Sequence, residues 1–404
     1  MLNIQKGRRD FLLSVVGRVV SGFGDEVALV ALTLRLQADG AHPYEVGLLL
    51  AAGVLPALVV ARSVGRLVDS HDSRHLLVVG GVVEAAATIP LIFLHSVVLI
   101  LLLVAVLGAA TSVTAATWSA LVPQVVGEDQ VPKAVSTQQS SAALLLVAAP
   151  AAGGLLTGAF GAGLPMALDA ATFVVMTLAA ALVRTRRAPE RGASVTSSSR
   201  LGGGFAVLRA DRLLGPLFGG VALVVFLVGM VDVVLVYLVR DTFRAGAGWY
   251  GVAQASWIAG MVAGSLCAGR VGSEVGQVRA TIAGMALACA GLAGFAVAPA
   301  VWILVPLSVL GGAGNGYTGS CLSTLLVLRT PASARGRVSA AANGVVGAAQ
   351  GASLLLGGVV ALALSPREIY AVAGLLGLAA AVALAVATSS RLVPRLPLGD
   401  GPGS

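Results

Sequence analysis

Apolar runs of about 20 residues or more, separated by short polar stretches, fill almost the whole sequence. An α-helix of this length crosses the hydrocarbon core of a bilayer. Only 11% of the 404 residues are charged and 57% are hydrophobic, whereas soluble domains carry about 25% charged residues. We therefore expect an all-α integral membrane protein with twelve transmembrane helices, at 11–36, 46–68, 76–95, 97–122, 134–160, 163–183, 214–238, 248–270, 279–298, 301–328, 338–363 and 369–388.

The distribution of basic residues predicts how these helices are oriented. With twelve helices, 21 of the 26 Lys and Arg residues fall on the side that holds both termini, and one, Arg18, falls inside the first helix. Positive charge collects on the cytoplasmic side of membrane proteins. We expect both termini in the cytoplasm, a location in the cell's cytoplasmic (inner) membrane, and contact between the basic loops and anionic lipids. The net charge of +8 thus reflects topology and predicts no binding to nucleic acid.

One long polar segment divides the sequence into two parts with related patterns. We expect an N-terminal six-helix bundle at 1–183, a cytoplasmic linker at 184–213, a C-terminal six-helix bundle at 214–390 and a disordered cytoplasmic tail at 391–404. The glycine pairs 153–154 and 357–358 lie 204 residues apart, and Gly-Arg pairs at 65–66 and 269–270 share the same offset. This offset is close to half of the sequence and indicates two pseudo-symmetric bundles, between which transporters bind their substrates.

Several ionisable residues fall inside the predicted helices, where charge is expensive and therefore usually functional. Arg18 and Asp25 lie seven residues apart on one face of the first helix, and Glu26 is turned by about 100° from Asp25. A carboxyl group in such a place could load a proton on one side of the membrane and release it on the other. A permanent structural ion pair is the competing interpretation. The candidate proton-coupling residues are Asp25, Arg18, Glu26, Glu84 and Asp232, and Asp169 is a weaker candidate.

Uncharged polar residues at the same depth could line a central substrate cavity. They are Gln138, Gln139, Asn315, Tyr317, Asn343 and Gln350.

The expected loop between the second and third helices is similar to a signature of the major facilitator superfamily. The stretch GRLVDSHDSRHLL (65–77) resembles its G-x-L-x-D-R-x-G-R-R pattern, with matches at Gly65, Leu67, Asp69 and Arg74 and departures at Ser70, Asp72 and Ser73. The resemblance, which extends over essentially the whole sequence, implies a cytoplasmic latch between the two halves. Its expected members are Gly65, Asp69, Arg74, Arg335 and Arg337. An ordinary charged turn is the alternative.

Further motifs resemble the branch of this superfamily that holds macrolide-efflux and enterobactin-exporter proteins. They are Gly24-Asp25, LVPQVVGEDQVPKAVSTQQS (121–140) and RGRV (335–338). The stretch AAPAAGG (148–154) is similar to the fifth-helix signature G-P-x-x-G-G of antiporters, with Pro150, Gly153 and Gly154 in place. A kinked, closely packed helix would have the same composition.

The resemblance implies a secondary active transporter that exports an amphipathic small molecule, of drug, macrolide or siderophore type, by proton antiport. A lipid or lysolipid flippase, or a metabolite transporter, on the same fold is the alternative. The sequence holds no Ser-His-Asp order, HExxH, CxxC or phosphate-binding loop, so we expect no enzyme. We also expect no cofactor and no metal, a proton gradient as the energy source, and a monomer.

The orientation can be tested by labelling a cysteine in the linker. Cysteine placed at Ser197 or Ser198 should resist a membrane-impermeant maleimide in intact cells, because the linker is expected in the cytoplasm. It should react once the cells are permeabilised. Ready labelling in intact cells would reverse the predicted orientation.

Overall fold

A computed structural model describes residues 2–127, 130–183, 206, 209, 211, 213–331 and 334–392. The linker is therefore described at only four positions, and Ser197, Ser198 and the tail beyond 392 lie outside the described residues. Before the linker, the helices are α1 (Leu2–Ala38), α2 (Pro43–Ser70), α3 (Ser73–Leu91), α4 (Val97–Val126), α5 (Val131–Phe160) and α6 (Gly163–Leu182). After it come α8 (Leu214–Tyr237), η2 (Leu238–Thr242), α9 (Ala247–Ala268), α10 (Glu274–Val297), η3 (Val301–Ile303), α11 (Leu304–Arg329), α12 (Arg335–Val360) and α13 (Pro366–Leu392).

Each predicted membrane-spanning run overlaps one long helix, and local sequence signals explain several helix starts. The Asp72 side chain caps α3 by accepting hydrogen bonds from the amides of Arg74 and His75. Ser273 caps α10 in the same way, through the amide of Gly276. The largest difference from the sequence prediction is at the N-terminus. There α1 begins at Leu2 rather than residue 11, so the basic N-terminal segment continues the first helix.

Nine helices among the described residues are long and apolar enough to cross a membrane. They are α2, α3, α4, α6, α8 with η2, α9, α10, α12 and α13. The first helix is not one of the nine, since it holds Asp25, Glu26 and Arg35 within one span length. Helices α5 and α11 are also outside the nine.

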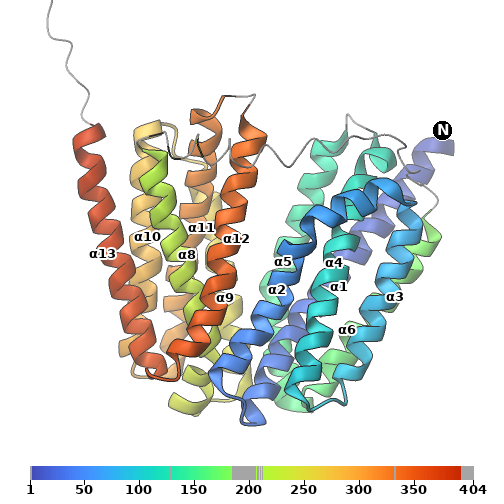
Figure 1. Ribbon diagram of the computed structural model, residues 1–404, viewed down its shortest axis with the longest axis horizontal. Helices are drawn as coiled ribbons and strands as arrows, with labels where there is room; N and C mark the ends of the chain where they lie inside the picture. Colours follow the sequence, from blue (N-terminus) through green and yellow to red (C-terminus); the bar gives the residue numbers. More distant parts are fainter. Residues whose placement is uncertain are drawn as a thin grey trace, which may run out of the picture.

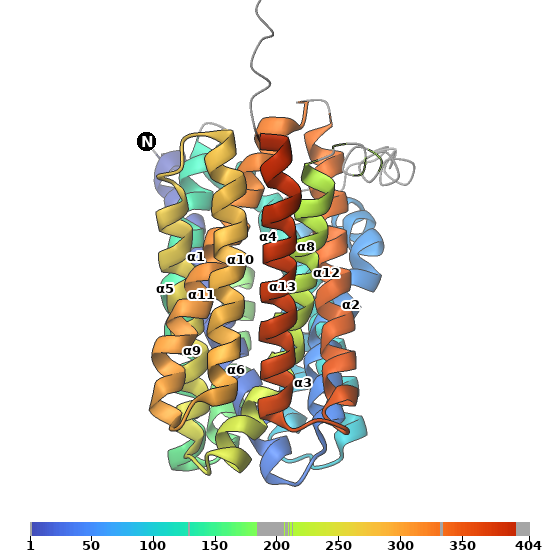
Figure 2. The same cartoon turned by 90° about the vertical axis from the view of Figure 1, so that its left-hand side faces the viewer.

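The helices form two groups that approach each other at one end of the molecule (Figure 1). Helices α1–α6 lie on one side and α8–α13 on the other, and both ends of the described chain lie at the end where the groups separate. In Figure 2, which is turned by 90°, the second group faces the viewer, and its helices run nearly parallel. The groups meet along two helix pairs, α5 with α9 and α2 with α12.

Glycines bring the backbones of these helix pairs together at the end opposite the termini. A Cβ atom on Gly154 of α5 would lie 3.0 Å from the Cα of Gly251 in α9. A Cβ atom on Gly358 of α12 would lie 2.5 Å from the Cα of Tyr44 in α2. Small residues permit such close approach where lipid provides no hydrophobic drive between helices. We call these two contacts the glycine seam.

Two hydrogen bonds between the groups reinforce the same end of the molecule. The Gln37 amide of α1 donates to the Asp241 carboxylate of η2 over 2.7 Å. The Tyr237 hydroxyl donates to the backbone oxygen of Ala41, also over 2.7 Å. The end of the molecule away from the termini is therefore the joined end.

The two glycine pairs that share the 204-residue offset occupy equivalent positions in the structure. Gly153 packs against the backbone of α1 at Val27, and Gly357 packs against the backbone of α8 at Met230. In both cases the partner is the first helix of the same group. The next residues, Gly154 and Gly358, contact the second helix of the opposite group. Corresponding glycines therefore perform corresponding packing roles.

An ionic cluster anchors the end of the linker to the second group. The Arg329 guanidinium at the end of α11 donates to both carboxylate oxygens of Asp211, each over 2.8 Å, and also binds Glu274 of α10. Partial burial alone would raise the pKa of Asp211. Hydrogen bonds from the amides of Leu214 and Leu213, together with Arg329, outweigh burial and hold the pKa of Asp211 below its ordinary value. The end of the linker is thus held at the start of α8.

Substitution of Gly251 tests the glycine seam. Gly251→Ala would place its methyl group against the backbone oxygen of Pro150, and such overpacking costs about 1–3 kcal/mol. We expect a lower thermal midpoint for the purified protein and weaker cross-linking between cysteines placed on α5 and α9. Gly219→Ala in α8 is the matched control, since no neighbouring atom lies within 4 Å of its added Cβ. Equal stability of the two variants would contradict the importance of this contact.

Candidate functional site

Three carboxyl side chains from different helices of the first group meet inside the membrane region. They belong to Asp25 on α1, Glu84 on α3 and Asp169 on α6. A Cβ atom on Gly24 would lie 2.6 Å from the Asp169 Oδ1 atom, so the glycine makes room for this carboxyl group beside Asp25. Asp25 is close enough to interact electrostatically with both Asp169 and Glu84. We call these three residues the acidic triad.

Glu84 is the most deeply buried member of the triad, with none of its surface exposed. The Thr114 hydroxyl of α4 donates to its Oε1 atom over 2.8 Å. Gly80, one turn earlier on α3, allows the Thr114 side chain to approach this closely. The Glu84 Oε2 atom is buried and has no hydrogen-bond partner. A buried carboxyl group in this state readily holds a proton, because ionisation away from water is costly.

Asp169 is 3% exposed, and the Thr172 hydroxyl lies 3.4 Å from its Oδ1 atom. It was only a weak candidate in the sequence, since nothing in the pattern relates residue 169 to residue 25. The structure shows that Gly24 provides this relation. No role for Thr114 or Thr172 was predicted from the sequence. For Thr114, the available signal was the spacing of the threonines at 111, 114 and 117, which places their hydroxyls along one face of a helix.

Glu26 and Asp232 are not part of the triad. The Tyr250 hydroxyl of α9 is close enough to interact electrostatically with Glu26 of the first group and with Asp232 of the second. Both acidic residues are half-buried. Arg18 lies two turns before Asp25 on α1 and is also half-buried.

The predicted cavity residues lie on α5, α11 and α12. Asn315 and Tyr317 are half-buried in α11, and Asn343 is exposed on α12. Gln350 of α12 lies against α8, where its Nε2 atom would be 2.9 Å from a Cβ atom on Gly229. Helix α5 holds Gln138 and Gln139, whose side chains are outside the described part of the chain.

The helix ends that hold the predicted latch residues lie at the separated end of the molecule, and two of these residues have hydrogen bonds within their own halves. Arg74 donates to the backbone oxygen of Ala181 at the end of α6. Arg335 donates to the backbone oxygen of Thr330 over 3.3 Å. Gly65 and Arg337 are exposed, and Asp69 is half-buried. The latch itself stays a prediction.

The antiporter-like motif lies at the glycine seam. The backbone oxygen of Pro150 contacts Gly251, Gly153 packs against α1, and Gly154 packs against α9. A proline in the helix removes one backbone hydrogen bond and bends the chain there. These three residues therefore shape the contact between the halves.

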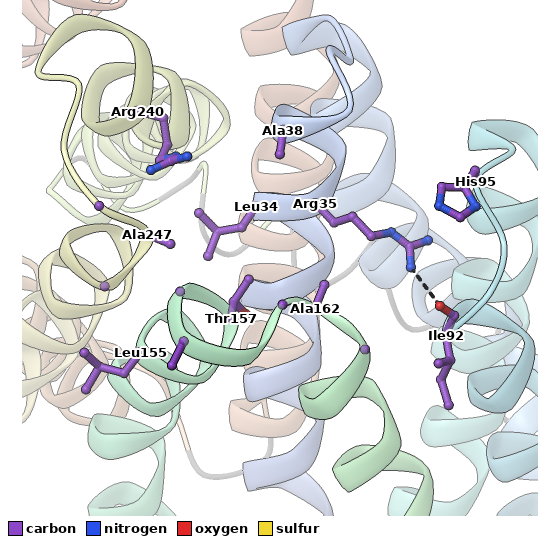
Figure 3. A pocket seen from close by; sticks show the side chains of 16 residues that line it. Leu34, Arg35, Ala38, Ile92, His95, Leu155, Thr157, Ala162, Arg240 and Ala247 are labelled. Carbon is purple, nitrogen blue, oxygen red and sulfur yellow. Dashed lines mark hydrogen bonds between the residues drawn. The ribbon is translucent and has the colours of Figure 1, made fainter.

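The joined end also holds a cavity of about 680 Å³ between the two groups (Figure 3). Arg35, His95, Arg240 and Leu155 are among its lining residues. The Arg35 guanidinium donates to the backbone oxygens of Leu91 and Ile92, over 2.8 and 3.4 Å, so it caps the end of α3. This cavity is far along α1 from the acidic triad and is a separate feature.

Within the described ranges, no group of three or more His, Cys, Asp or Glu side chains could hold a metal ion.

Solved structures share this arrangement of helices. The nucleoside transporter NupG matches with a TM-score of 0.71 and 13% identity, over 94% of this chain and 98% of its own. A bacterial homologue of the iron transporter ferroportin, in an inward-facing state, matches with a TM-score of 0.71 and 15% identity, over 95% and 98%. Both are transporters of the major facilitator fold, and this chain shares that fold.

The sequence comparison is more specific. Residues 11–400 match the transmembrane secretion effector family, and the chain belongs to this family within the major facilitator superfamily. Macrolide efflux protein A of Streptococcus pyogenes is 23% identical over 266 residues. That alignment spans 64% of this chain and 65% of the relative, which is slightly less than two thirds of the relative's length.

Removal of the Thr114 hydroxyl tests how Glu84 is held. Thr114→Val would leave both oxygens of Glu84 without a hydrogen-bond donor, which costs about 1–3 kcal/mol for a buried group. We expect a lower thermal midpoint of the purified protein. Thr117→Val is the matched control, because the Thr117 hydroxyl donates only to the Val113 oxygen of its own helix. The interpretation is wrong if both variants unfold at the same temperature.

Proposed function

We propose that this protein is a secondary active transporter that exports an amphipathic small molecule, of macrolide, drug or siderophore type, in exchange for protons. All long helices would then be membrane spans, arranged as two pseudo-symmetric bundles of six. The family and the fold establish a transporter. The similarity to a macrolide efflux protein supports the substrate class and the direction of transport.

The acidic triad is the observation that supports proton coupling. Glu84 and Asp169 are buried and have one hydroxyl group each as a neighbour, so ionisation of several adjacent carboxyl groups is costly and the neutral form is favoured. Three such groups in mutual electrostatic contact share protons, so that losing one proton alters the affinity of the others. Asp25 is the half-buried member and therefore the one through which protons enter and leave.

The arrangement of the two halves supports alternating access. The glycine seam joins them at one end, and they separate toward the termini. With the basic residues placed in the cytoplasm, this conformation receives substrate from the inside. We propose the cytoplasmic membrane as the location, with both termini and the predicted latch on the cytoplasmic side. Anionic lipids would contact the basic ends of the helices.

Exchange would follow from competition within the first half. A protonated triad is electrically neutral and tolerates the closed, apolar environment needed for reorientation. An amphipathic cation that binds near Asp25 would stabilise the ionised carboxyl group and displace its proton. Return of a proton from the outside would then release the substrate. Proton and substrate thus use one site in alternation.

Transport in proteoliposomes tests this mechanism. An imposed proton gradient should drive uptake of a radiolabelled macrolide into inside-out vesicles by the unmodified protein. Asp25→Asn should reduce this gradient-driven flux at least tenfold, because the amide cannot bind and release a proton. It should keep passive exchange of the macrolide, because size and hydrogen-bonding capacity are nearly unchanged.

Asp39→Asn is the control, since Asp39 is an exposed acid in the turn after the same helix. It should transport like the unmodified protein. Full coupling in a well-folded Asp25→Asn protein would remove Asp25 from the mechanism. Transport of lipid that is insensitive to an uncoupler would instead favour a flippase.

A further inference from the structure

A small enclosed cavity lies within the second half, away from the acidic triad. Helices α8, α9, α10, α11 and α13 surround it, and its volume is about 30 Å³. A volume of about 10–15 Å³ on this measure is enough for one water molecule. The cavity therefore has room for a water molecule or a bare monovalent ion.

Four oxygen-bearing side chains line this cavity from four helices. They are Asp232 of α8, Gln254 of α9, Ser308 of α11 and Tyr370 of α13. Oxygen ligands, with at least one carboxylate, are the donors that small hard cations prefer. Trp257 and Phe295 add aromatic surface to the wall of the cavity.

Hydrogen bonds to neighbours fix the orientation of two of these side chains. The Gln254 Nε2 group donates to the Tyr250 hydroxyl over 2.7 Å, which leaves Oε1 as the acceptor of that amide. The Tyr370 hydroxyl lies 3.4 Å from the backbone oxygen of Val231, and its ring stacks on Phe295 with centroids 4.8 Å apart. Ser308 is 2% exposed. Ser308 and Tyr370 are thus buried, whereas Asp232 and Gln254 are half-buried.

Asp232 is the acidic residue of this cavity, and no Lys or Arg is among the described residues that line it. When the Asp232 carboxyl group is ionised, its negative charge is therefore not balanced by a basic side chain of the cavity wall. The other titratable groups near it are Tyr370 from α13 and Tyr250 from α9, which are 2% and 1% exposed. An ionised carboxylate in the membrane interior is stable only with a counter-charge.

We propose that the Asp232 cavity binds one small monovalent cation, either a hydronium ion or Na⁺, at a site separate from the acidic triad. The role of this site, as a second cation site of a transporter, rests on the proposed function. Its occupancy can be measured without transport.

Tyr250 connects this cation site to the first half of the protein. Its hydroxyl accepts from Gln254 and also lies within hydrogen-bonding reach of Thr33 on α1. The next residue, Gly251, packs against Pro150 in the glycine seam. Cation binding orders Gln254 and Tyr250, and therefore stabilises the joined arrangement of the two halves.

Thermal unfolding of the purified full-length protein in lipid nanodiscs tests the proposal. Ligands that bind only the folded state raise its thermal midpoint. The midpoint would be measured with NaCl or choline chloride at equal ionic strength, from pH 5.5 to pH 9, for the unmodified protein and for Asp232→Asn. Choline is too large for the cavity and serves as the inert cation.

A Na⁺ site predicts a rise of about 2–4 °C in NaCl over choline chloride, which Asp232→Asn abolishes. A hydronium site predicts no Na⁺ effect. Instead, the difference in midpoint between the unmodified protein and Asp232→Asn depends on pH. Asp39→Asn should respond like the unmodified protein in both arms. The proposal is wrong if Asp232→Asn and the unmodified protein respond identically to Na⁺ and to pH, or if choline acts as Na⁺ does.

Ser308→Ala provides a second variant in case Asp232→Asn does not fold. It removes one neutral oxygen and should raise the Na⁺ or proton concentration for half-maximal stabilisation by about 3- to 10-fold. An unchanged concentration for half-maximal stabilisation would show that Ser308, and with it this cavity, does not bind the cation. A cation response without gradient-driven macrolide transport would contradict the proposed function alone, and transport without a cation response would contradict this inference alone.

Discussion

Close backbone contact between two helix pairs determines how the two halves of this protein are joined. In α5 and α9, and again in α2 and α12, glycines replace side chains where the halves meet. Lipid surrounds both halves equally, so hydrophobic burial contributes little to their association. Packing of backbone against backbone, helped by the Tyr237 and Gln37 hydrogen bonds, provides the attraction. Because the glycines come in equivalent pairs from each half, the contact has the symmetry of the fold.

The ionisable groups are distributed so that each half holds its own acid inside. The triad of Asp25, Glu84 and Asp169 is built from helices of the first half, and its hydroxyl donors come from there as well. Asp232 lies on the first helix of the second half and lines a small cavity there. Tyr250 of α9 is close enough to interact electrostatically with Asp232 and with Glu26 of the first half. Each half therefore carries ionisable groups of its own at membrane depth.

Much of the fold was predictable, because membrane helices must satisfy their own backbone and so appear as apolar runs. Asp25 and Glu84 were predictable as candidates, since charge in such runs is conspicuous. Their joint environment was not predictable: Asp169 meets Asp25 only because Gly24 leaves space between α1 and α6. The contacts of Arg74 were not predictable either, because they depend on which end of the molecule is joined. The sequence does not indicate which conformation the protein adopts. Nothing in the sequence singled out Gln254 and Tyr250. Their hydrogen bond to each other, and the place of Gln254 in the cavity wall, are visible only in the structure.

The glycine seam also determines how far each residue moves when two rigid halves change their relative angle. Its two contacts define a line across the joined end of the molecule, and rotation about that line moves atoms in proportion to their distance from it. Tyr250 is next to Gly251 and so lies close to this axis. The first turns of α3 and α12, at the separated end, lie far from it. A small change of angle at the glycine seam is thereby converted into a large displacement at the opposite membrane surface.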